Sequence, residues 1–591
     1  MSSAIQRAAN LVSRLEVLVR REARAQREHF EAQWAQPLGE RVRTGRAMES
    51  LRFAGINWSS GRIRLECDRN DSKFREGDYL ILHQGDPREE GVIGAVLEYD
   101  EGTKLEVSPK TGPISRLEEI PDGWIADEGT FDLSGYFLDA LGEVADRETG
   151  RSIILPLILG DLQPHVDMAA YERAWMAALD VGLNERQAEA TASAYATDLA
   201  YLIQGPPGTG KTYVLAHVAR MLAEDGARVM VTALTHRAIN NALNMIAHVA
   251  ETDIPICKVG HPSRADDLRV DNCESFSQSG FQRLNGGYII GATPFATRTS
   301  RLAEVEFDTI IFDEASQITL PLAILGMLAG KRYIFIGDDH QLPPVTVMPR
   351  EISLAHSSIF GYLAHRGYST VLNRTYRMND ALAAWPSRTF YDGELQPAEG
   401  VGSRRLQLGS PQPRWQAVLA PDEPAVFVDL FQTNTTIRSR READAVVDLI
   451  LTLLAAGVPA TEIGVVTPYR AQGREIRNLL RRALPSPTAR RQIVIDTVER
   501  MQGQEREVVL VSLATASATF AETLADFYFQ PQRLNVTITR SRTKLIIIGS
   551  SNVLRAEPAD PELAGHVALF REFIETCTTV KAMEPKRLPE A

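Results

Sequence analysis

The stretch Gln204-Gly205-Pro206-Pro207-Gly208-Thr209-Gly210-Lys211-Thr212 decides the fold of this chain. It fits the phosphate-binding pattern G-x-x-x-x-G-K-[ST], between an apolar run, Leu199–Ile203, that predicts a strand and residues 212–224, which predict a helix. Glycines let such a loop fold tightly, so that its N–H groups and the helix N-terminus point at phosphate. We expect residues 205–212 to hold a nucleotide, with Lys211 on the β- and γ-phosphates and Thr212 on Mg²⁺. The alternative is a Gly/Pro-rich turn that binds nothing.

The composition is that of a soluble globular protein. A length of 591 residues predicts three or four domains, and the 44% hydrophobic and 24% charged content is ordinary. No apolar run approaches the roughly 20 residues of a membrane span. The N-terminal apolar segment is interrupted by Arg14 and Glu16, so it does not predict a signal peptide. We expect a cytoplasmic monomer that does not bind membranes.

The cysteines and the net charge argue against disulfide-rich and metal-binding proteins and against proteins that coat nucleic acid. Four cysteines are scattered without a C-x-x-C pair, which disfavours a disulfide framework or an iron–sulfur cluster. Cys257, His261 and Cys273 fit no usual zinc spacing. A net charge of −12 argues against coating nucleic acid through bulk positive charge. Arginines concentrate between residues 470 and 506, where they predict either a local basic groove or a solvated helical face.

The N-terminal part predicts a helix and a barrel. Leucines at helical spacing predict one long helix over Ile5–Trp34, ending before Pro37. Alternating runs separated by turns then predict a small antiparallel barrel, with strands at 62–67, 79–83, 92–99 and 104–107. The expected domains are a stalk (1–50), the barrel (51–115), a first α/β domain (116–370), a second α/β domain (371–555), and a C-terminal helix and tail (556–591).

The remainder alternates between strands and helices, which predicts parallel α/β sheets. The first set of strands is Arg228–Thr232, Phe307–Phe312 and Tyr333–Ile336. The second set is Val426–Leu430, Ile463–Thr467, Val508–Ser512 and Leu545–Gly549, with a helix over 441–454. We interpret this pattern as two α/β units that share one nucleotide site.

Two carboxylates follow the strand Phe307–Phe312. Asp313 and Glu314 would lie at the carboxyl edge of the sheet, beside the phosphate-binding loop. There Asp313 can hold the Mg²⁺ shell and Glu314 can polarise the attacking water.

A third strand ends in Gly337-Asp338-Asp339-His340-Gln341-Leu342-Pro343-Pro344. With Asp313-Glu314-Ala315-Ser316-Gln317, this segment resembles superfamily 1B helicases, the group of the nonsense-mediated-decay helicase, senataxin and the immunoglobulin μ-binding helicase. The resemblance implies two tandem RecA-like domains, preceded by a helical stalk and a barrel of the family's 1B type. It also implies that Gln341 senses the γ-phosphate.

Further motifs follow in family order from Leu183 to Gly549. For the nucleotide, the resemblance implies adenine reading by Gln187, adenine stacking by Tyr376, γ-phosphate contact by Arg377, ribose contact by Glu505 and an arginine finger at Arg540. For nucleic acid, it implies contacts from Thr235, His236, Arg237, Thr293, Pro468, Tyr469, Arg470 and Thr497. Departures from the family pattern are Thr375 for Gln, Asn379-Asp380 for His-Pro, and Met501 for Phe.

The resemblance predicts a nucleic-acid-stimulated ATPase that uses ATP and Mg²⁺ to move along single strands, 5′ to 3′, and to open tailed duplexes. Its catalytic residues would be Lys211, Glu314, Gln341, Arg377 and Arg540. One alternative is a nucleotide-switched clamp on nucleic acid or a protein partner, and another is a metabolic P-loop enzyme such as a small-molecule kinase. The motifs contact phosphates, so the choice between DNA and RNA, the pathway and any protein partner stay open.

Overall fold

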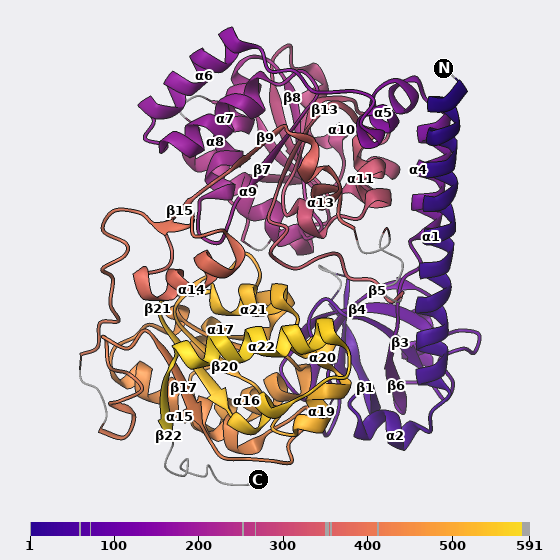
Figure 1. Cartoon of the computed structure of the whole chain (residues 1–591). Coiled ribbons are helices and arrows are strands. Elements are labelled where there is room, and N and C mark those ends of the chain that lie inside the picture. Colours follow the sequence, from indigo (N-terminus) through magenta and orange to yellow (C-terminus); the bar gives the residue numbers. More distant parts are fainter. Residues whose placement is uncertain are drawn as a thin grey trace. The chain divides into compact units, whose positions relative to one another are not determined.

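The computed structural model describes residues 2–57, 61–70, 72–250, 253–265, 267–348, 354, 357–409 and 413–581 (Figure 1). The chain forms two compact units: residues 1–9, 142–345 and 356–591 make the larger one, and residues 10–141 and 346–355 make the smaller one. No helix among the described residues combines the length and apolar character that crossing a membrane requires.

A closed antiparallel barrel dominates the smaller unit, as the alternating runs predict. Helix α1 spans Ser2–Trp34, which confirms the long N-terminal helix, and is followed by α2 (Leu38–Arg43). The barrel order is β1-β2-β5-β4-β3-β6. Its strands are β1 (Ala47–Asn57), β2 (Arg62–Glu66), β3 (Tyr79–His83), β4 (Ile93–Asp100), β5 (Lys104–Thr111) and β6 (Trp124–Glu128). β1 begins before residue 51 and β6 lies beyond residue 115, so the barrel takes in more of the chain than the expected range.

A buried polar triad sits inside the smaller unit. The guanidinium of Arg41 and the Nε2 atom of His83 both contact Oδ2 of Asp127, the latter at 2.8 Å. All three residues are buried, with exposed fractions of at most 3%. Gly85 donates its N–H to Nδ1 of His83, which leaves Nε2 as the atom that donates to Asp127. The triad ties α2 to strands β3 and β6.

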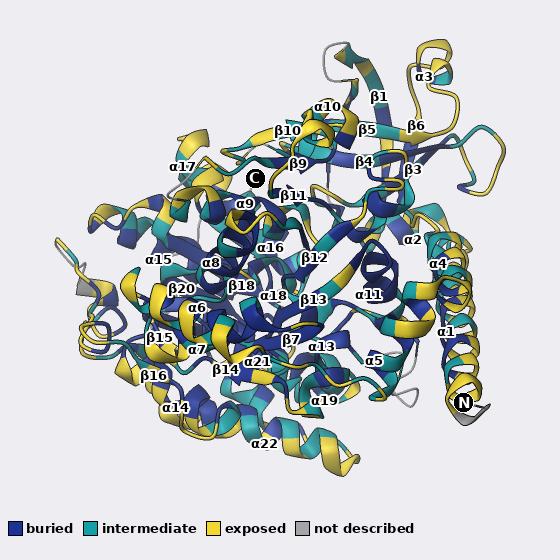
Figure 2. Cartoon of the chain, turned by 90° about the horizontal axis from the view of Figure 1, so that it is seen from above, coloured by how far each residue is buried: buried dark blue, intermediate teal, exposed yellow. Residues whose placement is uncertain are grey.

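The first sheet has eight parallel strands in the order β10-β9-β11-β8-β12-β13-β7-β14. Its six inner strands are mostly buried (Figure 2), as expected for a parallel sheet covered on both faces, whereas the edge strands β10 and β14 are partly exposed. The strands are β7 (Ala200–Gln204), β8 (Arg228–Thr232), β9 (Ile256–Val259), β10 (Asp271–Cys273), β11 (Tyr288–Gly291), β12 (Phe307–Phe312), β13 (Gly330–Gly337) and β14 (Ser369–Val371). The helices are α6 (Met168–Asp180), α7 (Glu185–Ala196), α8 (Lys211–Glu224), α9 (His236–Val249), α10 (Phe276–Ser279), α11 (Leu320–Met327) and α13 (Ile359–Leu363).

The second sheet has six parallel strands in the order β19-β18-β20-β21-β17-β22. The strands are β17 (Ala425–Asp429), β18 (Ile463–Thr467), β19 (Val494–Thr497), β20 (Arg506–Ser512), β21 (Ser541–Gly549) and β22 (Thr578–Lys581). The helices are α14 (Asp380–Phe390), α15 (Arg440–Ala455), α16 (Arg470–Ala483), α17 (Pro487–Gln492), α18 (Val498–Met501), α19 (Ala518–Thr523), α20 (Ala525–Tyr528), α21 (Pro531–Ile538) and α22 (Pro561–Thr576). The two RecA-like sheets are therefore confirmed. A small pair, β15 (Arg374–Thr375) and β16 (Gln396–Pro397), lies between them in sequence.

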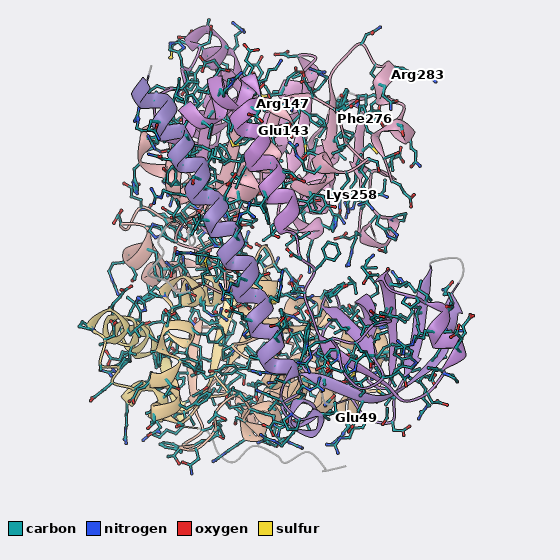
Figure 3. All side chains as sticks on the ribbon, turned by 90° about the vertical axis from the view of Figure 1, so that its right-hand side faces the viewer. Glu49, Glu143, Arg147, Lys258, Phe276 and Arg283 are labelled. Atoms are coloured by element: carbon teal, nitrogen blue, oxygen red, sulfur yellow. The ribbon has the colours of Figure 1, made fainter. Side chains whose placement is uncertain are left out.

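Two details differ from the expected C-terminal and linking segments. The C-terminal region adds a strand, because β22 pairs with β17, and the predicted tail after residue 582 lies outside the described residues. The link from barrel to first sheet runs through α4 (Ser134–Asp146), a π-helix (Gly150–Ile154) and α5 (Leu155–Leu159), whereas α3 (Ser115–Glu119) lies between β5 and β6. Glu143 on α4 bridges Arg147, 3.1 Å away, and Arg298 (Figure 3 labels Glu143 and Arg147).

A buried carboxyl group organises one end of the second sheet. Oε2 of Glu442, on α15, accepts hydrogen bonds from the Ser512 hydroxyl at 2.8 Å and the Ala514 N–H at 2.7 Å. Gln472, on α16, donates to the same Ser512 hydroxyl at 2.9 Å. Glu442 is fully buried, and burial raises its pKa from 4.5 to about 8. The carboxyl group therefore carries a proton at neutral pH.

Replacing Asp127 with Ala should destabilise the smaller unit by about 3–5 kcal/mol, because it leaves the buried Arg41 guanidinium without a counter-charge. The midpoint of urea unfolding, followed by tryptophan fluorescence, measures this. The matched control is Asp68→Ala, which removes the exposed partner of Arg52 and should leave the midpoint unchanged. Equal midpoints for the two variants would show that the triad contributes nothing.

Glu442→Gln should remove a pH dependence of stability. Unfolded Glu442 loses its proton near pH 4.5, whereas the folded protein holds it to about pH 8. The folded state therefore binds the additional proton, and the wild-type free energy of unfolding should fall by roughly 1 kcal/mol per pH unit across that window. Thermal melts of both proteins between about pH 5 and pH 8 measure this. Parallel Tm curves would contradict the assignment.

Candidate functional site

The order of the first sheet gathers the candidate residues at one edge. β12, β13 and β7 are neighbours and parallel, so their carboxyl ends meet there. The phosphate-binding loop follows β7, Asp313 follows β12, and Asp338 follows β13. Thr235 and Thr293 come after β8 and β11, the next strands along the same edge. The nucleotide candidates and the nucleic-acid candidates therefore occupy adjoining parts of one edge.

At its glycines, the phosphate-binding loop has no room for a side chain. Gly208 and Gly210 have φ values of 74° and 83°, a region that side chains disfavour. A Cβ atom on Gly210 would lie 2.7 Å from Nε2 of Gln187, and one on Gly208 would lie 2.5 Å from Cβ of Arg377. Gly210 is also the N-cap of α8, so no cap side chain occupies the first-turn N–H groups. Such a loop fits a phosphate group.

Lys211 lies in the middle of a cluster of charges. Its Nζ atom donates to the Gly205 carbonyl at 2.5 Å. Burial lowers the pKa of Lys211, Glu314 and Asp338 oppose that shift, and Arg377 and Arg540 reinforce it. These interactions bring two carboxylates and two guanidinium groups around one lysine, which is an arrangement able to hold a polyphosphate.

The Mg²⁺ candidates fit the ion when phosphate completes its shell. Asp313 is buried, and burial followed by the neighbouring Glu314 raises its pKa to about 7. Thr212 is the second residue of α8, at the same sheet edge. No group of three or more metal-binding side chains occurs among the described residues. One carboxylate and one hydroxyl suffice, because Mg²⁺ usually keeps waters and takes phosphate oxygens.

Glu314 has an unusual backbone and a partner from the second sheet. Its φ value of 51° is in the left-handed region, which residues with a side chain adopt rarely. Gln502, directly after α18, donates from Nε2 to Oε2 of Glu314 at 3.0 Å. The carboxylate proposed to polarise water is therefore contacted by the segment that also carries Thr497 and Glu505.

The second sheet supplies two buried arginines. Arg377 donates to Oε2 of Glu505 at 2.7 Å and to the Thr539 carbonyl at 2.8 Å. Burial raises the pKa of Glu505, but Arg377 and then Arg542 outweigh it, so the net shift is downward. Arg540 donates to the Val536 carbonyl at 2.9 Å and to Oε1 of Gln341 at 3.3 Å. Burial lowers the pKa of Arg540 to about 9, so it stays cationic at neutral pH.

The adenine candidates lie side by side, although Gln187 is already bonded within the chain. Nε2 of Gln187 donates to the Thr209 carbonyl at 3.0 Å, and its Oε1 accepts the Asn184 N–H at 3.1 Å. Asn184 also donates to the Tyr376 hydroxyl at 2.8 Å. Tyr376 is 43% exposed, and its backbone N–H donates to the Gly208 carbonyl. Tyr376 thus presents an accessible aromatic ring beside the loop.

On the first sheet the nucleic-acid candidates are partly exposed. Thr235 caps α9 by accepting the Ala238 N–H, and Arg237 is exposed. His236 is partly buried, and burial followed by Lys258 and Arg264 lowers its pKa to about 4, so it is neutral at physiological pH. Thr293 is partly buried at the start of a 3₁₀ turn.

On the second sheet the candidates follow two neighbouring strands. Pro468, Tyr469 and Arg470 come directly after β18 and are partly exposed. Thr497 ends β19 and is only 4% exposed. The Tyr469 ring packs against Tyr528, with centroids 6.3 Å apart. The segment 497–506 then runs from the carboxyl end of β19 to the start of β20, and so joins these candidates to Glu505.

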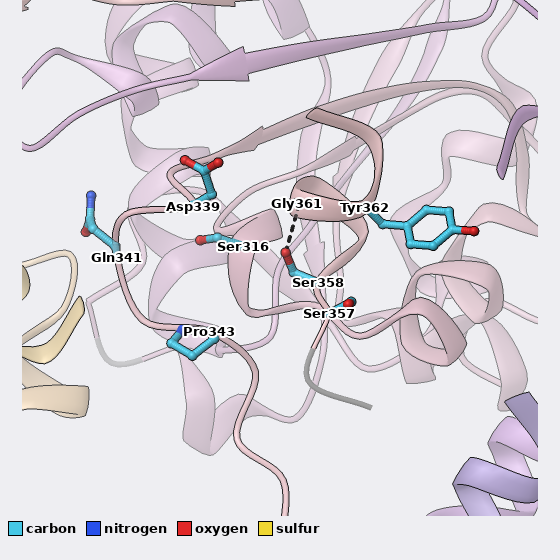
Figure 4. Close-up of a pocket in the computed structure, with 8 residues that line it drawn as sticks. All are labelled: Ser316, Asp339, Gln341, Pro343, Ser357, Ser358, Gly361 and Tyr362. Atoms are coloured by element: carbon cyan, nitrogen blue, oxygen red, sulfur yellow. Dashed lines mark hydrogen bonds between the residues drawn. The ribbon is translucent and has the colours of Figure 1, made fainter. Parts of the chain in front are cut away.

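A cavity adjoins the site at Gln341 (Figure 4). Its volume is about 450 Å³. The hydroxyl of Ser316, which is buried, has no hydrogen-bond partner among the described residues. The cavity is lined by Ser316, Asp339, Gln341, Pro343, Ser357, Ser358, Gly361 and Tyr362.

The sequence assigned no role to four residues of the hydrogen-bond network around the candidates. Asp338 contacts Gln341 and Gln502 contacts Glu314, whereas Tyr391 and Asn535 join the network through Asp338. Each lies inside or beside a motif, which was the only available signal. Two of the residues that depart from the family pattern have structural roles: Met501 is fully buried, and Asn379 caps α14 by accepting the Leu382 N–H.

Comparison with known proteins gives consistent results. Two family models, both described as an AAA domain, match residues 187–347 and 355–552. The DNA replication ATP-dependent helicase/nuclease DNA2 of Mus musculus is 29% identical over 422 residues, which are 65% of this chain and 39% of that protein. The Regulator of nonsense transcripts 1 homolog of Drosophila melanogaster is 27% identical over 436 residues, 66% of this chain and 36% of that protein.

The chain thus spans well under half the length of these relatives. Among solved structures, an Arterivirus nonstructural protein 10 (helicase) is 15% identical with a TM-score of 0.38, covering 90% of this chain and 82% of that one. The ordered motifs, the two parallel sheets and the sequence relatives together confirm the resemblance of the chain to the superfamily 1B helicases.

Proposed function

We propose that this chain is a nucleic-acid-stimulated ATPase that moves along single strands of DNA or RNA and opens duplexes or displaces bound proteins. The observation that carries the proposal is the charge cluster around Lys211, to which the first sheet contributes Glu314 and the second contributes Arg377 and Arg540. A site built from two sheets changes when the sheets move, so hydrolysis and movement are linked. The family resemblance favours movement from 5′ to 3′.

In the proposed reaction, Lys211 and the first-turn N–H groups of α8 hold the β- and γ-phosphates. Thr212 and Asp313 would hold Mg²⁺, which would supply charge neutralisation at the phosphates. Glu314 accepts a proton from the attacking water. Gln341, Arg377 and Arg540 donate to the γ-phosphate oxygens, where negative charge develops. An arginine finger of this kind contributes roughly 10³–10⁵ in rate.

The nucleotide base and ribose have their own proposed contacts. Tyr376 stacks on adenine with its exposed ring, and Gln187 reads the base edge after releasing one of its present partners. Glu505 contacts the ribose near its ion pair with Arg377. The glycines and prolines of residues 205–210 shape the loop around the phosphates.

The proposed strand path crosses both sheets. Thr235, His236, Arg237 and Thr293 contact phosphates on the first sheet, and Pro468, Tyr469, Arg470 and Thr497 contact them on the second. Support comes from their positions at the carboxyl ends of neighbouring strands in each sheet. Because Thr497 is buried, its contact is proposed through the backbone or after a local rearrangement.

We divide the chain into a stalk at 1–46, a barrel at 47–128, a first RecA-like domain to residue 370, a second to 555 and a C-terminal segment, following the observed strands.

Steady-state ATP hydrolysis should rise strongly when single-stranded DNA or RNA is added, and the stimulation should weaken at high salt. Phosphate contacts release counterions, so binding falls steeply as salt increases. The measurement is phosphate release with no polymer, with each single strand and with a tailed duplex, at low and high salt. Equal hydrolysis in all conditions would favour a nucleotide-switched clamp instead.

Glu314→Gln and Lys211→Ala should fail in different ways. The Gln variant should bind ATP normally but hydrolyse it roughly 10²–10⁴-fold more slowly, because only the proton acceptor is lost. The Ala variant should bind ATP weakly, because the phosphate-facing ammonium group is lost. Titration with a fluorescent ATP analogue and phosphate release separate the two effects. Near-normal turnover in both variants would contradict the assignment of Glu314 and Lys211 to the ATP site.

A further inference from the structure

A buried hydrogen-bond chain joins the two sheets through Asp338. Asp338 follows β13 and is only 1% exposed. Its Oδ2 atom accepts from Nε2 of Gln341 at 2.6 Å and from the Tyr391 hydroxyl at 2.8 Å. Gln341 belongs to the first sheet, whereas Tyr391 directly follows α14 and packs in the core of the second. One carboxylate oxygen is therefore shared by a donor from each side.

The chain continues from Tyr391 to the helix that precedes Arg540. Nδ2 of Asn535, on α21, donates to the Tyr391 hydroxyl at 2.8 Å and to the His340 carbonyl at 2.9 Å. Arg540, two residues after α21, donates to Oε1 of Gln341. Asp338 and Arg540 thus hold the two polar atoms of the Gln341 amide, and Tyr391 with Asn535 forms a second connection between the same two elements.

This geometry sets up a competition at Gln341. Nε2 is the atom of this side chain that can donate to a phosphate oxygen, and here it donates to Asp338. Turning Gln341 toward phosphate removes that donor from a buried carboxylate, which is unfavourable unless another donor stays. The Tyr391 hydroxyl is the donor that stays on Oδ2, while the His340 N–H stays on Oδ1 at 3.2 Å. Burial, with Asp338 beside it, raises the pKa of Tyr391 well above its usual value, so the hydroxyl keeps its proton.

We propose that Tyr391 is a positioning residue for ATP hydrolysis. It keeps its hydrogen bond to Asp338 while Gln341 turns to the γ-phosphate. Through its hydrogen bond with Asn535 on α21, it also makes that turn depend on the position of Arg540. This inference rests on the proposed function, since it requires Gln341 to act on phosphate. Tyr391 itself touches no reacting atom. Its effect passes through Asp338 and Gln341.

Tyr391→Phe in the full chain tests the inference. The ring stays, including its edge contact with His340 at 5.3 Å between centroids, so no cavity forms. The kcat of strand-stimulated hydrolysis should fall about tenfold to a hundredfold, the effect of losing one hydrogen bond to a charged group. The KM for ATP should change less than about threefold, because the phosphate-binding loop is untouched.

Tyr333→Phe is the matched control. Tyr333 is a fully buried tyrosine on β13, the strand that leads to Asp338, and its hydroxyl donates to the Gly330 carbonyl at 2.8 Å. Losing this hydroxyl should lower Tm without lowering kcat. If Tyr333→Phe lowers kcat as much as Tyr391→Phe does, the effect is a general consequence of losing a buried hydroxyl, and the inference is wrong.

A double-mutant cycle with Gln341→Ala completes the test. If Tyr391 acts through Gln341, Tyr391→Phe should reduce kcat no further in the Gln341→Ala background. Additive losses would overturn the positioning role. Normal hydrolysis by Gln341→Ala alone would instead remove the proposed role of Gln341 in the reaction. An impaired Gln341→Ala together with a normal Tyr391→Phe would leave the proposed function standing and reject only the role of Tyr391.

Discussion

The site depends on giving partners to positive charge that is removed from water. Arg377 and Arg540 are buried and Lys211 is partly buried, and an unpaired buried cation is strongly unfavourable. The chain supplies acceptors to each: a carbonyl of the phosphate-binding loop for Lys211, Glu505 for Arg377, and Val536 with Gln341 for Arg540. At the proposed nucleotide site, phosphate oxygens would replace these acceptors. Because the bond from Arg540 to Gln341 joins the two sheets, the nucleotide would then take the place of a contact between them.

Sheet order explains why those groups meet. Parallel strands bring the loops that follow β7, β12 and β13 to one edge, although β7 ends at Gln204, β12 at Phe312 and β13 at Gly337. In the second sheet, the segment 497–506 passes from the end of β19 to the start of β20. A disturbance at Thr497 therefore has a short covalent route to Gln502, which contacts Glu314, and to Glu505, which contacts Arg377.

Sequence reasoning succeeded where the pattern is local. The phosphate-binding loop, the buried strands β8 and β12, and the long helix α1 were all predicted, because periodicity and motif spacing depend on neighbouring residues. β1 was missed because it is irregular: its register shifts between Phe53 and Gly55, and Ser50 has a φ value of 59°. β6 was missed because four consecutive buried residues show no alternation. The hydrogen bond between Tyr391 and Asn535 joins residues 144 positions apart, a pairing that only tertiary structure creates.

The left-handed backbone conformation of Glu314 reduces the stability of the chain. A residue with a side chain in the left-handed region is less stable than glycine there by about 1 kcal/mol or more. The chain therefore carries a small permanent instability at the position proposed to accept a proton. Replacement by glycine would relieve this strain and would also remove the proposed acceptor, so stability and the proposed chemistry favour different residues at this position.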